Sequence, residues 1–316
     1  MSRFKKFADT LLGWPPSVLF FGKKRGSEQP AQALATVHRE IMNWRIKLFG
    51  CLLVSISTLY AVEHAFRQYP GVEYFQFELT PDWQEKSEWT FARLMYPPGP
   101  NDGYRGRFDG DWHEGSSLWT QDYPRADRHF SQAVRRLTRV DARSVEQSVN
   151  LEDGDDAFYW PWLYAVQVGE WGLTEKQGKI MRDYLLRGGF FMADDFHGNY
   201  EYEMFLKRIR FVFPDRPIVD IPEDDPIFHT VFDLDDRFQV PGAEHLRVGA
   251  KNPSDGGVGA HWRGIYDDKG RIMVAISYNS DLGDAWEWAD SPNYPERFSG
   301  LAMRIGVNYI IYAMTH

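Results

Sequence analysis

Three groups of acidic residues and their polar neighbours give this sequence its candidate chemistry. In chain order they are Asp122 and Asp127; Asp194, Asp195, His197 and Glu201; and Asn279, Asp281, Asp284 and Glu287. Carboxylates with a histidine suit a hard or borderline divalent metal ion. Two carboxylates at a suitable separation would also suit hydrolysis of a glycosidic bond. These residues therefore form a candidate ligand or metal site, wherever the fold brings the groups together.

Each acid also has a structural interpretation, because acids at strand ends often cap helices or pair with basic side chains. Asp122 could cap the helix that follows it, with Pro124 in the first turn. Asp194 and Asp195 are harder to explain in this way, since the doublet ends a buried strand. Basic partners for the acids are Arg93, Arg125, Lys207 and Arg208.

Three further side chains have competing interpretations. His229, in the turn Asp-Pro-Ile-Phe-His, is interpreted as a hydrogen-bonding residue rather than a ligand. Trp286 and Trp288 could stack on a sugar ring or cover the edge of the sheet. Aromatic residues make up 16% of the chain, and a large aromatic core accounts for most of them without a ligand.

The stretch from 174 to 198 is the one around which the other elements are organised. Apolar residues at helical spacing predict a helix from Thr174 to Leu186, with Thr174 as its cap. Gly188 and Gly189 end that helix, and Phe190 to Ala193 reads as a strand buried on both faces. The second and third acidic groups follow predicted strands, and ligands of open α/β sheets bind at such carboxyl ends.

The remaining pattern predicts the α/β class, with a mostly parallel sheet and helices on both faces. Strands are expected at 89–96, 145–151, 158–166, 218–221, 262–266 and 271–278, and helices at about 124–139, 203–210 and 298–314. Asp267-Asp268-Lys269-Gly270 predicts a hairpin between the last two strands. Residues 66–87 form a connector, and residues 88–316 form the main domain.

Charge and cysteine content exclude some functions. The chain of 316 residues has a net charge of -9, which argues against nucleic acid as a partner, because binding phosphates requires a basic surface. The single cysteine, Cys51, excludes a disulfide within the chain.

The N-terminal segment predicts export. Residues 1–45 are basic and expected to be poorly ordered, and residues 46–65 contain the uncharged run LFGCLLVSISTLYAV. This run is shorter than the ~20 residues of a membrane span, yet long enough for the core of a signal peptide. It is expected to be a hydrophobic helix that attaches the protein to a membrane.

Two start codons remain open. If Met1 is the start, the run is a signal anchor that holds the main domain outside the cytoplasm, because positive charge precedes it. If Met42 is the start, the run is a signal peptide, with cleavage after Ala61 or Ala65 and a secreted product. A third interpretation is a buried amphipathic helix of a soluble protein.

Several phrases from about Glu88 to His316 resemble the domain-of-unknown-function 4159 family. They are FARLMY, WTQDYPRAD, FYWPWLY, LLRGGFFMADDF, RFVFPD, DDPIFH, YNSDLGDAWEW and RIGVNYIIYAMT. The resemblance implies a flavodoxin-like fold of the class I glutamine amidotransferase-like superfamily, in bacterial proteins that are exported or membrane-attached. The catalytic Cys of true amidotransferases has no counterpart here, because no Cys follows residue 51.

Two functional hypotheses follow, and the sequence favours the first. The first is a noncatalytic ligand-binding or scaffolding domain in an envelope assembly of membrane proteins, which the missing nucleophile favours. The second is a carboxylate- or metal-dependent hydrolase of a sugar or envelope polymer, which the clustered acids favour. Strongly raised carboxylate pKa values in a pocket would favour the enzyme, and acids fully paired with arginine would favour the binding domain.

Overall fold

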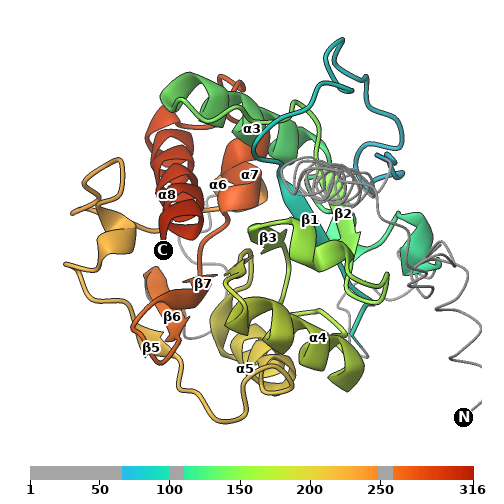
Figure 1. Cartoon of the computed structure of the whole chain (residues 1–316). Coiled ribbons are helices and arrows are strands. Elements are labelled where there is room, and N and C mark those ends of the chain that lie inside the picture. The colour runs from blue at the N-terminus through green and yellow to red at the C-terminus, as the bar shows by residue number, and fades with distance from the viewer. Residues whose placement is uncertain (1–65, 100–109, 248–258) are drawn as a thin grey trace, which may run out of the picture. The chain divides into compact units, whose positions relative to one another are not determined.

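The structure is a computed structural model that describes residues 66–99, 110–247 and 259–316, and its central feature is one seven-stranded sheet (Figure 1). In sheet order the strands are β2 (Gln147–Asn150), β1 (Ala92–Met95), β3 (Trp162–Ala165), β4 (Phe190–Ala193), β7 (Ile272–Tyr278), β6 (His261–Tyr266) and β5 (Val219–Asp220).

The sheet is mixed, with a parallel part and an antiparallel edge. The pairs β2–β1, β1–β3, β3–β4 and β4–β7 are parallel, and β7–β6 and β6–β5 are antiparallel. β6 and β7 form the hairpin that the Asp-Asp-Lys-Gly turn predicts, with Gly270 at φ +81°. The five parallel strands therefore end at one edge, and the second and third acidic groups follow β4 and β7 at that edge.

Helices cover both faces of the sheet, as the alternation of elements predicts (Figure 1). The principal helices are α3 (Arg125–Leu137), α4 (Glu175–Leu186), α5 (Gly198–Ile209), α6 (Ala243–Arg247), α7 (Leu282–Glu287) and α8 (Glu296–Thr315). α3, α7 and α8 pack on one face, and α4 and α5 pack on the other. α5 starts five residues earlier than expected, directly after the second acidic group.

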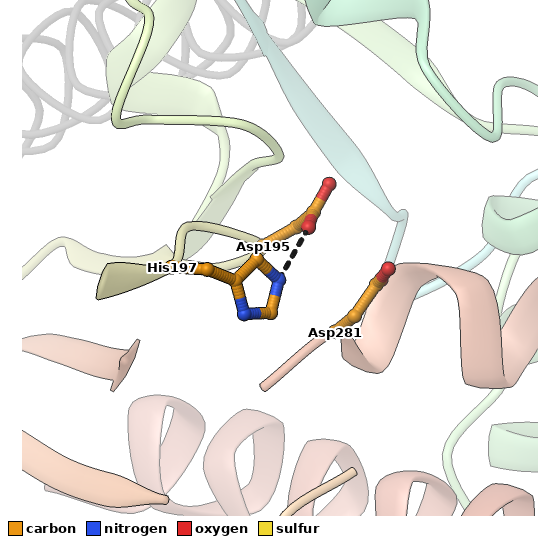
Figure 2. A group of neighbouring side chains, drawn as sticks. All are labelled: Asp195, His197 and Asp281. Atoms are coloured by element: carbon orange, nitrogen blue, oxygen red, sulfur yellow. Dashed lines mark hydrogen bonds and ion pairs between the residues drawn. The ribbon is translucent and has the colours of Figure 1, made fainter. Parts of the chain in front are cut away.

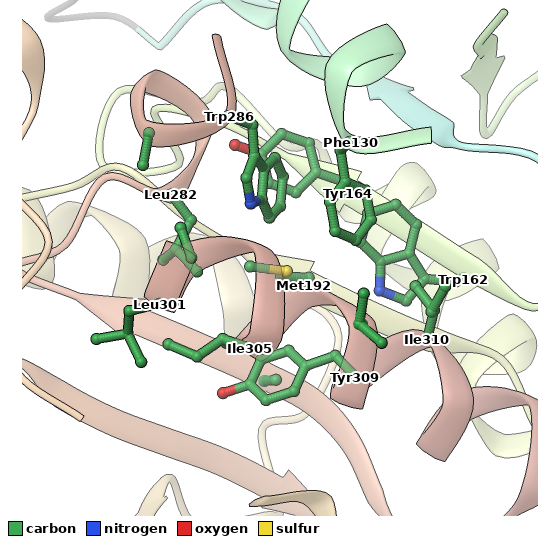
Figure 3. Packing of buried hydrophobic residues seen from close by; sticks show 14 of the residues in the cluster. Phe130, Trp162, Tyr164, Met192, Leu282, Trp286, Leu301, Ile305, Tyr309 and Ile310 are labelled. Carbon is green, nitrogen blue, oxygen red and sulfur yellow. The ribbon is translucent and has the colours of Figure 1, made fainter. Parts of the chain in front are cut away.

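Two hydrophobic cores fill the space between the helices and the sheet, and β4 contributes to both. Phe190 and Met192 join the core under α3, α7 and α8, part of which Figure 3 shows. Phe191 and Ala193 join the core under α4 and α5. This alternation is what a central strand with two buried faces requires. Trp286 is fully buried and stacks on Phe130 with ring centroids 4.4 Å apart, so it covers the sheet and is not available to a sugar.

The local signals around β4 are confirmed. The Thr174 side chain accepts from the backbone amide of Gln177 in a capping box at the start of α4. The chain turns at Gly188, where φ is +114°, and enters β4. One capping prediction is wrong: α3 begins after Pro124 with no side-chain cap, because the Asp122 carboxylate turns away from the helix toward the acidic residues that follow β7.

The predicted N-terminal segments, 1–45 and 46–65, lie outside the described residues, and so does the proposed hydrophobic helix. Residues 66–87, predicted to be a connector, contain no helix or strand. Within the described ranges, no helix has the length and apolar character to cross a membrane.

Candidate functional site

The carboxyl edge of the parallel strands gathers acids from all three groups. Asp195 and His197 follow β4, Asp281 and Asp284 come from the turn after β7 and the first turn of α7, and Asp122 precedes α3. Three sets of side chains each place one ligand atom per residue within 4.8 Å of the others. The sets are Asp195, His197 and Asp281; Asp122, Asp281 and Asp284; and Glu73, Asp122 and Glu287.

The first set lies against the end of β4 (Figure 2). His197 Nε2 is 3.1 Å from Asp195 Oδ1, and Asp281 faces the same edge of the imidazole ring. All three residues are buried. Burial alone would lower the pKa of His197, but the hydrogen bond and negative charge of Asp195 outweigh it and raise that pKa above its usual value.

Asp194 has a different role from Asp195, although the two are adjacent. Asp194 Oδ2 accepts hydrogen bonds from the Tyr164 hydroxyl and from the backbone amides of Leu282 and Gly283, each at 2.9 Å. These bonds tie the end of β4 to the start of α7. Burial, with the nearby charge of Asp195, raises the pKa of Asp194 to about 7. Asp194 is therefore the residue that positions α7, and Asp195 is the one that faces the site.

The second set joins Asp122 to Asp281 and Asp284. Asp281 Oδ1 accepts from the Asp284 amide at 2.8 Å, and Asp284 Oδ2 accepts from the Ala243 amide at 2.6 Å. Asp122 Oδ2 is buried and has no hydrogen-bond partner among the residues that the structure describes. Burial and then the neighbouring carboxylates raise the pKa values of Asp122 and Asp281 well above the usual range. Carboxylates forced together in this way repel one another unless a proton or a cation lies between them.

Backbone strain marks the same edge. Asp122, Asp195 and Asn279 have φ values of +59°, +52° and +62°, in the left-handed region that residues with a Cβ rarely enter. Asp and Asn tolerate this region better than most residues. Strained backbone of this kind clusters at functional sites, and here it aims two of the acids at the site.

Besides Asp194, three further predicted residues have structural partners in the fold. Asp127 is fully buried and forms a two-pronged ion pair with Arg93, with Nε 2.9 Å from Oδ2. Glu201 Oε2 accepts from the His197 amide at 2.6 Å, which satisfies the start of α5. Asn279 Oδ1 accepts from the Gly198 amide at 2.9 Å, also at the start of α5. These three side chains hold the elements together and leave the ligand positions to the others.

Two residues close to the acidic site, Glu73 and His245, were not predicted from the sequence. Glu73 lies in the connector, where it accepts from the Asp122 amide at 2.9 Å. His245 is on α6, in a stretch expected to be loop, and its ring lies 5.4 Å from that of His197. Burial, followed by the charge of His197, lowers the pKa of His245, which keeps its imidazole neutral. No sequence pattern near either residue distinguishes it from an ordinary surface residue.

A cleft of about 550 Å³ opens beside the acids, within the size range of small-molecule sites. Residues that line it include Glu73, Gln121, Arg247, Asp284, Trp288 and Tyr294. Trp288 thus remains a candidate aromatic contact for a ligand, unlike Trp286. His229 is in a turn, where its ring nitrogens lie 3.0 Å from Asp233 Oδ1 and 2.9 Å from the Glu223 carbonyl oxygen, which fits the hydrogen-bonding role expected of it.

Comparison with known families agrees with the resemblance in the sequence. The family model described as "Domain of unknown function (DUF4159)" matches residues 110–314, which is well over half of the chain. The chain belongs to this family. The match spans α3 to α8 and includes Asp122, Asp195, His197, Asp281 and Asp284, but not Glu73. No curated protein matches the chain.

Proposed function

We propose that this member of the DUF4159 family is a divalent-metal-dependent hydrolase whose site lies at the carboxyl edge of β4 and β7. The observation that carries the proposal is the convergence of Asp122, Asp195, Asp281 and Asp284 without a lysine or arginine partner in the described part of the chain. Among the described residues, no lysine or arginine forms an ion pair with any of these four. A divalent cation would supply the missing positive charge.

The side chains fit such an ion chemically. Carboxylate oxygens and an imidazole nitrogen are the donors that Mn²⁺, Zn²⁺ and Fe²⁺ accept, and all-carboxylate positions suit Mg²⁺ or Ca²⁺. A bound cation would lower the pKa of a water molecule and so provide a nucleophile at neutral pH. His197, held by Asp195, would be a nitrogen ligand of the cation, and the cleft would hold the substrate next to Asp284.

The test uses the full chain after removal of metal ions. We expect Mn²⁺ or Zn²⁺ to raise the melting temperature, because a cation at a hundred times its Kd adds about 2.7 kcal/mol of stability. We also expect metal-dependent cleavage within a panel of chromogenic esters, phosphoesters and glycosides. Asp195→Asn is expected to abolish the cleavage, and Asp183→Asn, at an exposed pair with Arg187, is expected to leave it unchanged. Failure of every cation to bind would refute the proposal.

The noncatalytic role remains a second candidate, and the absence of any Cys after residue 51 favours it. In this proposal the site binds a small-molecule or sugar ligand, with a metal ion and without turnover, and the domain serves as a scaffold for membrane proteins. Tight metal binding combined with no cleavage of any substrate in the panel would favour this role over the hydrolase.

Placement in the glutamine amidotransferase-like superfamily, with a flavodoxin-like fold, is also a proposal. It is supported by the order β2-β1-β3-β4-β7, which corresponds to the 2-1-3-4-5 order of flavodoxin-like sheets. Export, with the main domain outside the cytoplasm, is supported by the basic residues that precede the uncharged run at 48–62. Alkaline phosphatase fused after residue 65 in a bacterial host would test it, since that enzyme is active only outside the cytoplasm.

A further inference from the structure

We propose that the metal centre is dinuclear, with the Asp281 carboxylate as the ligand shared by two cations. This inference rests on the proposed function and adds the number of ions and the residues that hold each one. Asp281 belongs both to the set with Asp195 and His197 and to the set with Asp122 and Asp284. The first set defines site A and the second defines site B.

The backbone fixes Asp281 between the two sites. Its amide donates to the Val240 carbonyl at 2.9 Å, and its Oδ1 accepts from the Asp284 amide, as the cap of α7. The carboxylate is therefore held just after β7, within reach of Asp195 and His197 in one set and of Asp122 and Asp284 in the other. A carboxylate held in this position can give one oxygen to each of two cations, as bridging carboxylates in two-metal sites do.

A glycine keeps the space around the shared carboxylate open. A Cβ at Gly242 would lie 2.6 Å from Asp281 Oδ2, 2.9 Å from Asp284 Oδ2 and 3.2 Å from His245 Nδ1. These three atoms therefore lie around the position that a Cβ of residue 242 would occupy, and glycine leaves that position free. Asp281 and Asp284 therefore present oxygens side by side, as site B requires.

The second observation that points to a ligand is an oxygen without a partner. Asp122 is 1% exposed, its carboxylate lies close to those of Asp281 and Asp284, and among the described residues its Oδ2 has no hydrogen-bond partner. A buried carboxylate oxygen without a partner costs free energy, and a coordinated cation would remove that cost. In site A, His197 and Asp195 are 92% buried and present Nε2 and Oδ1 toward Asp281 (Figure 2).

The third acidic set is not included as a metal site. Both oxygens of Glu73 already accept hydrogen bonds, from the Gln121 side chain at 2.7 Å and from the Asp122 amide at 2.9 Å. The Tyr74 hydroxyl donates to Glu287 Oε1, so Glu287 also has a hydrogen-bond partner in this set.

The two sites differ in chemistry. Site A offers one nitrogen and two carboxylates, which suits Mn²⁺, Fe²⁺ or Zn²⁺. Site B offers three carboxylates and suits a hard cation. Mn²⁺ is acceptable to both donor sets and is paramagnetic, so it is the probe of choice for counting ions and for detecting whether two of them are close.

The experiment is a titration of the metal-free full chain with Mn²⁺, followed by calorimetry and by electron paramagnetic resonance. We expect two ions per chain and a spin-coupled signal in place of the isolated six-line spectrum. His197→Ala and Asp122→Asn, which remove a ligand from site A and site B respectively, are each expected to leave one ion and to restore the six-line spectrum. Asp281→Asn is expected to weaken both sites.

The outcomes separate this inference from the proposed function. One ion in the wild-type chain, or two ions without spin coupling, would overturn the dinuclear centre and leave a metal-dependent hydrolase possible. No bound ion would overturn both proposals. Asp183→Asn serves as the control for loss of an acid elsewhere, and thermal melting of each variant shows that the fold persists. If Asp281→Asn does not fold, the His197 and Asp122 variants still decide the number of ions.

Discussion

Replacing Asp194 should destabilise the fold far more than replacing the adjacent Asp195. Asp194 is fully buried, and its Oδ2 accepts three hydrogen bonds, from the Tyr164 hydroxyl and the amides of Leu282 and Gly283. A buried donor that loses its partner costs about 1–3 kcal/mol. Asp194→Ala leaves three such donors, and because the cavity can admit water, we expect a total loss of about 3–5 kcal/mol.

Two matched variants separate the hydrogen bonds from the charge. Asp194→Asn keeps an oxygen acceptor, and the pKa of about 7 means that the native carboxyl is already partly neutral at pH 7. We therefore expect this variant to lose about 1–2 kcal/mol, from an amide group that replaces the unpartnered Oδ1. Asp195→Asn should lose less than about 1 kcal/mol, because asparagine tolerates the φ of +52° and can keep the hydrogen bond to His197.

The assay is urea denaturation of the metal-free full chain at pH 7, followed by circular dichroism, with the midpoint compared at constant slope. The expected order of stability is wild type, Asp195→Asn, Asp194→Asn and Asp194→Ala. If Asp194→Ala is no less stable than Asp195→Asn, the role assigned to Asp194 in joining β4 to α7 is wrong.

Two further predictions test the crowding of the site and a surface ion pair. Gly283→Ala would place a Cβ 2.4 Å from Asp122 Oδ2, so we expect the Mn²⁺ affinity measured by calorimetry to fall at least about tenfold. Gly300→Ala, which has open space around it, is the control: it should leave the affinity unchanged and stabilise α8 by about 0.5–1 kcal/mol. Equal Mn²⁺ affinities in the two variants would contradict this account. The hydrogen bond from Arg135 lowers the pKa of Asp82 to about 2, so the pair adds stability above pH 4 that is lost as the pH falls toward 2. Asp82→Asn should therefore lose less than about 1 kcal/mol at pH 7 in urea denaturation, because solvent screens the pair, and the loss should vanish near pH 2.

Much of the fold could be predicted from the sequence because its signals are local. The capping box at Thr174, the glycine turn at Gly188 and the hairpin turn before Gly270 each depend on residues a few positions apart. The continuous apolar run 190–193 identified the central strand, since a strand buried on both faces has no polar side. The same reasoning placed two of the three acidic groups at one edge of the sheet.

The extents of some elements were decided by tertiary contacts. The stretch 158–166, expected to be one strand, divides into a 3₁₀ turn at Asp156–Tyr159 and β3 at Trp162–Ala165. α5 begins at Gly198 because the side chains of Glu201 and Asn279 accept from the first amides, and Asn279 follows β7, 81 residues along the chain from Gly198. Such a partner has no signature in the local sequence.

The sequence by itself determined which residue types reach the carboxyl edge, and the tertiary structure decided what each of them does there. Asp194 and Asp195 are indistinguishable in the sequence, yet one accepts amides from α7 and the other turns to His197 because its backbone is left-handed. Asp127 on α3 lies outside the site because it pairs with Arg93 on β1. His245 lies next to His197 in the site because of where α6 is placed. Periodicity and turn chemistry act over a few residues, whereas the charge and hydrogen-bond partners of a buried carboxylate come from chain segments that only folding brings together.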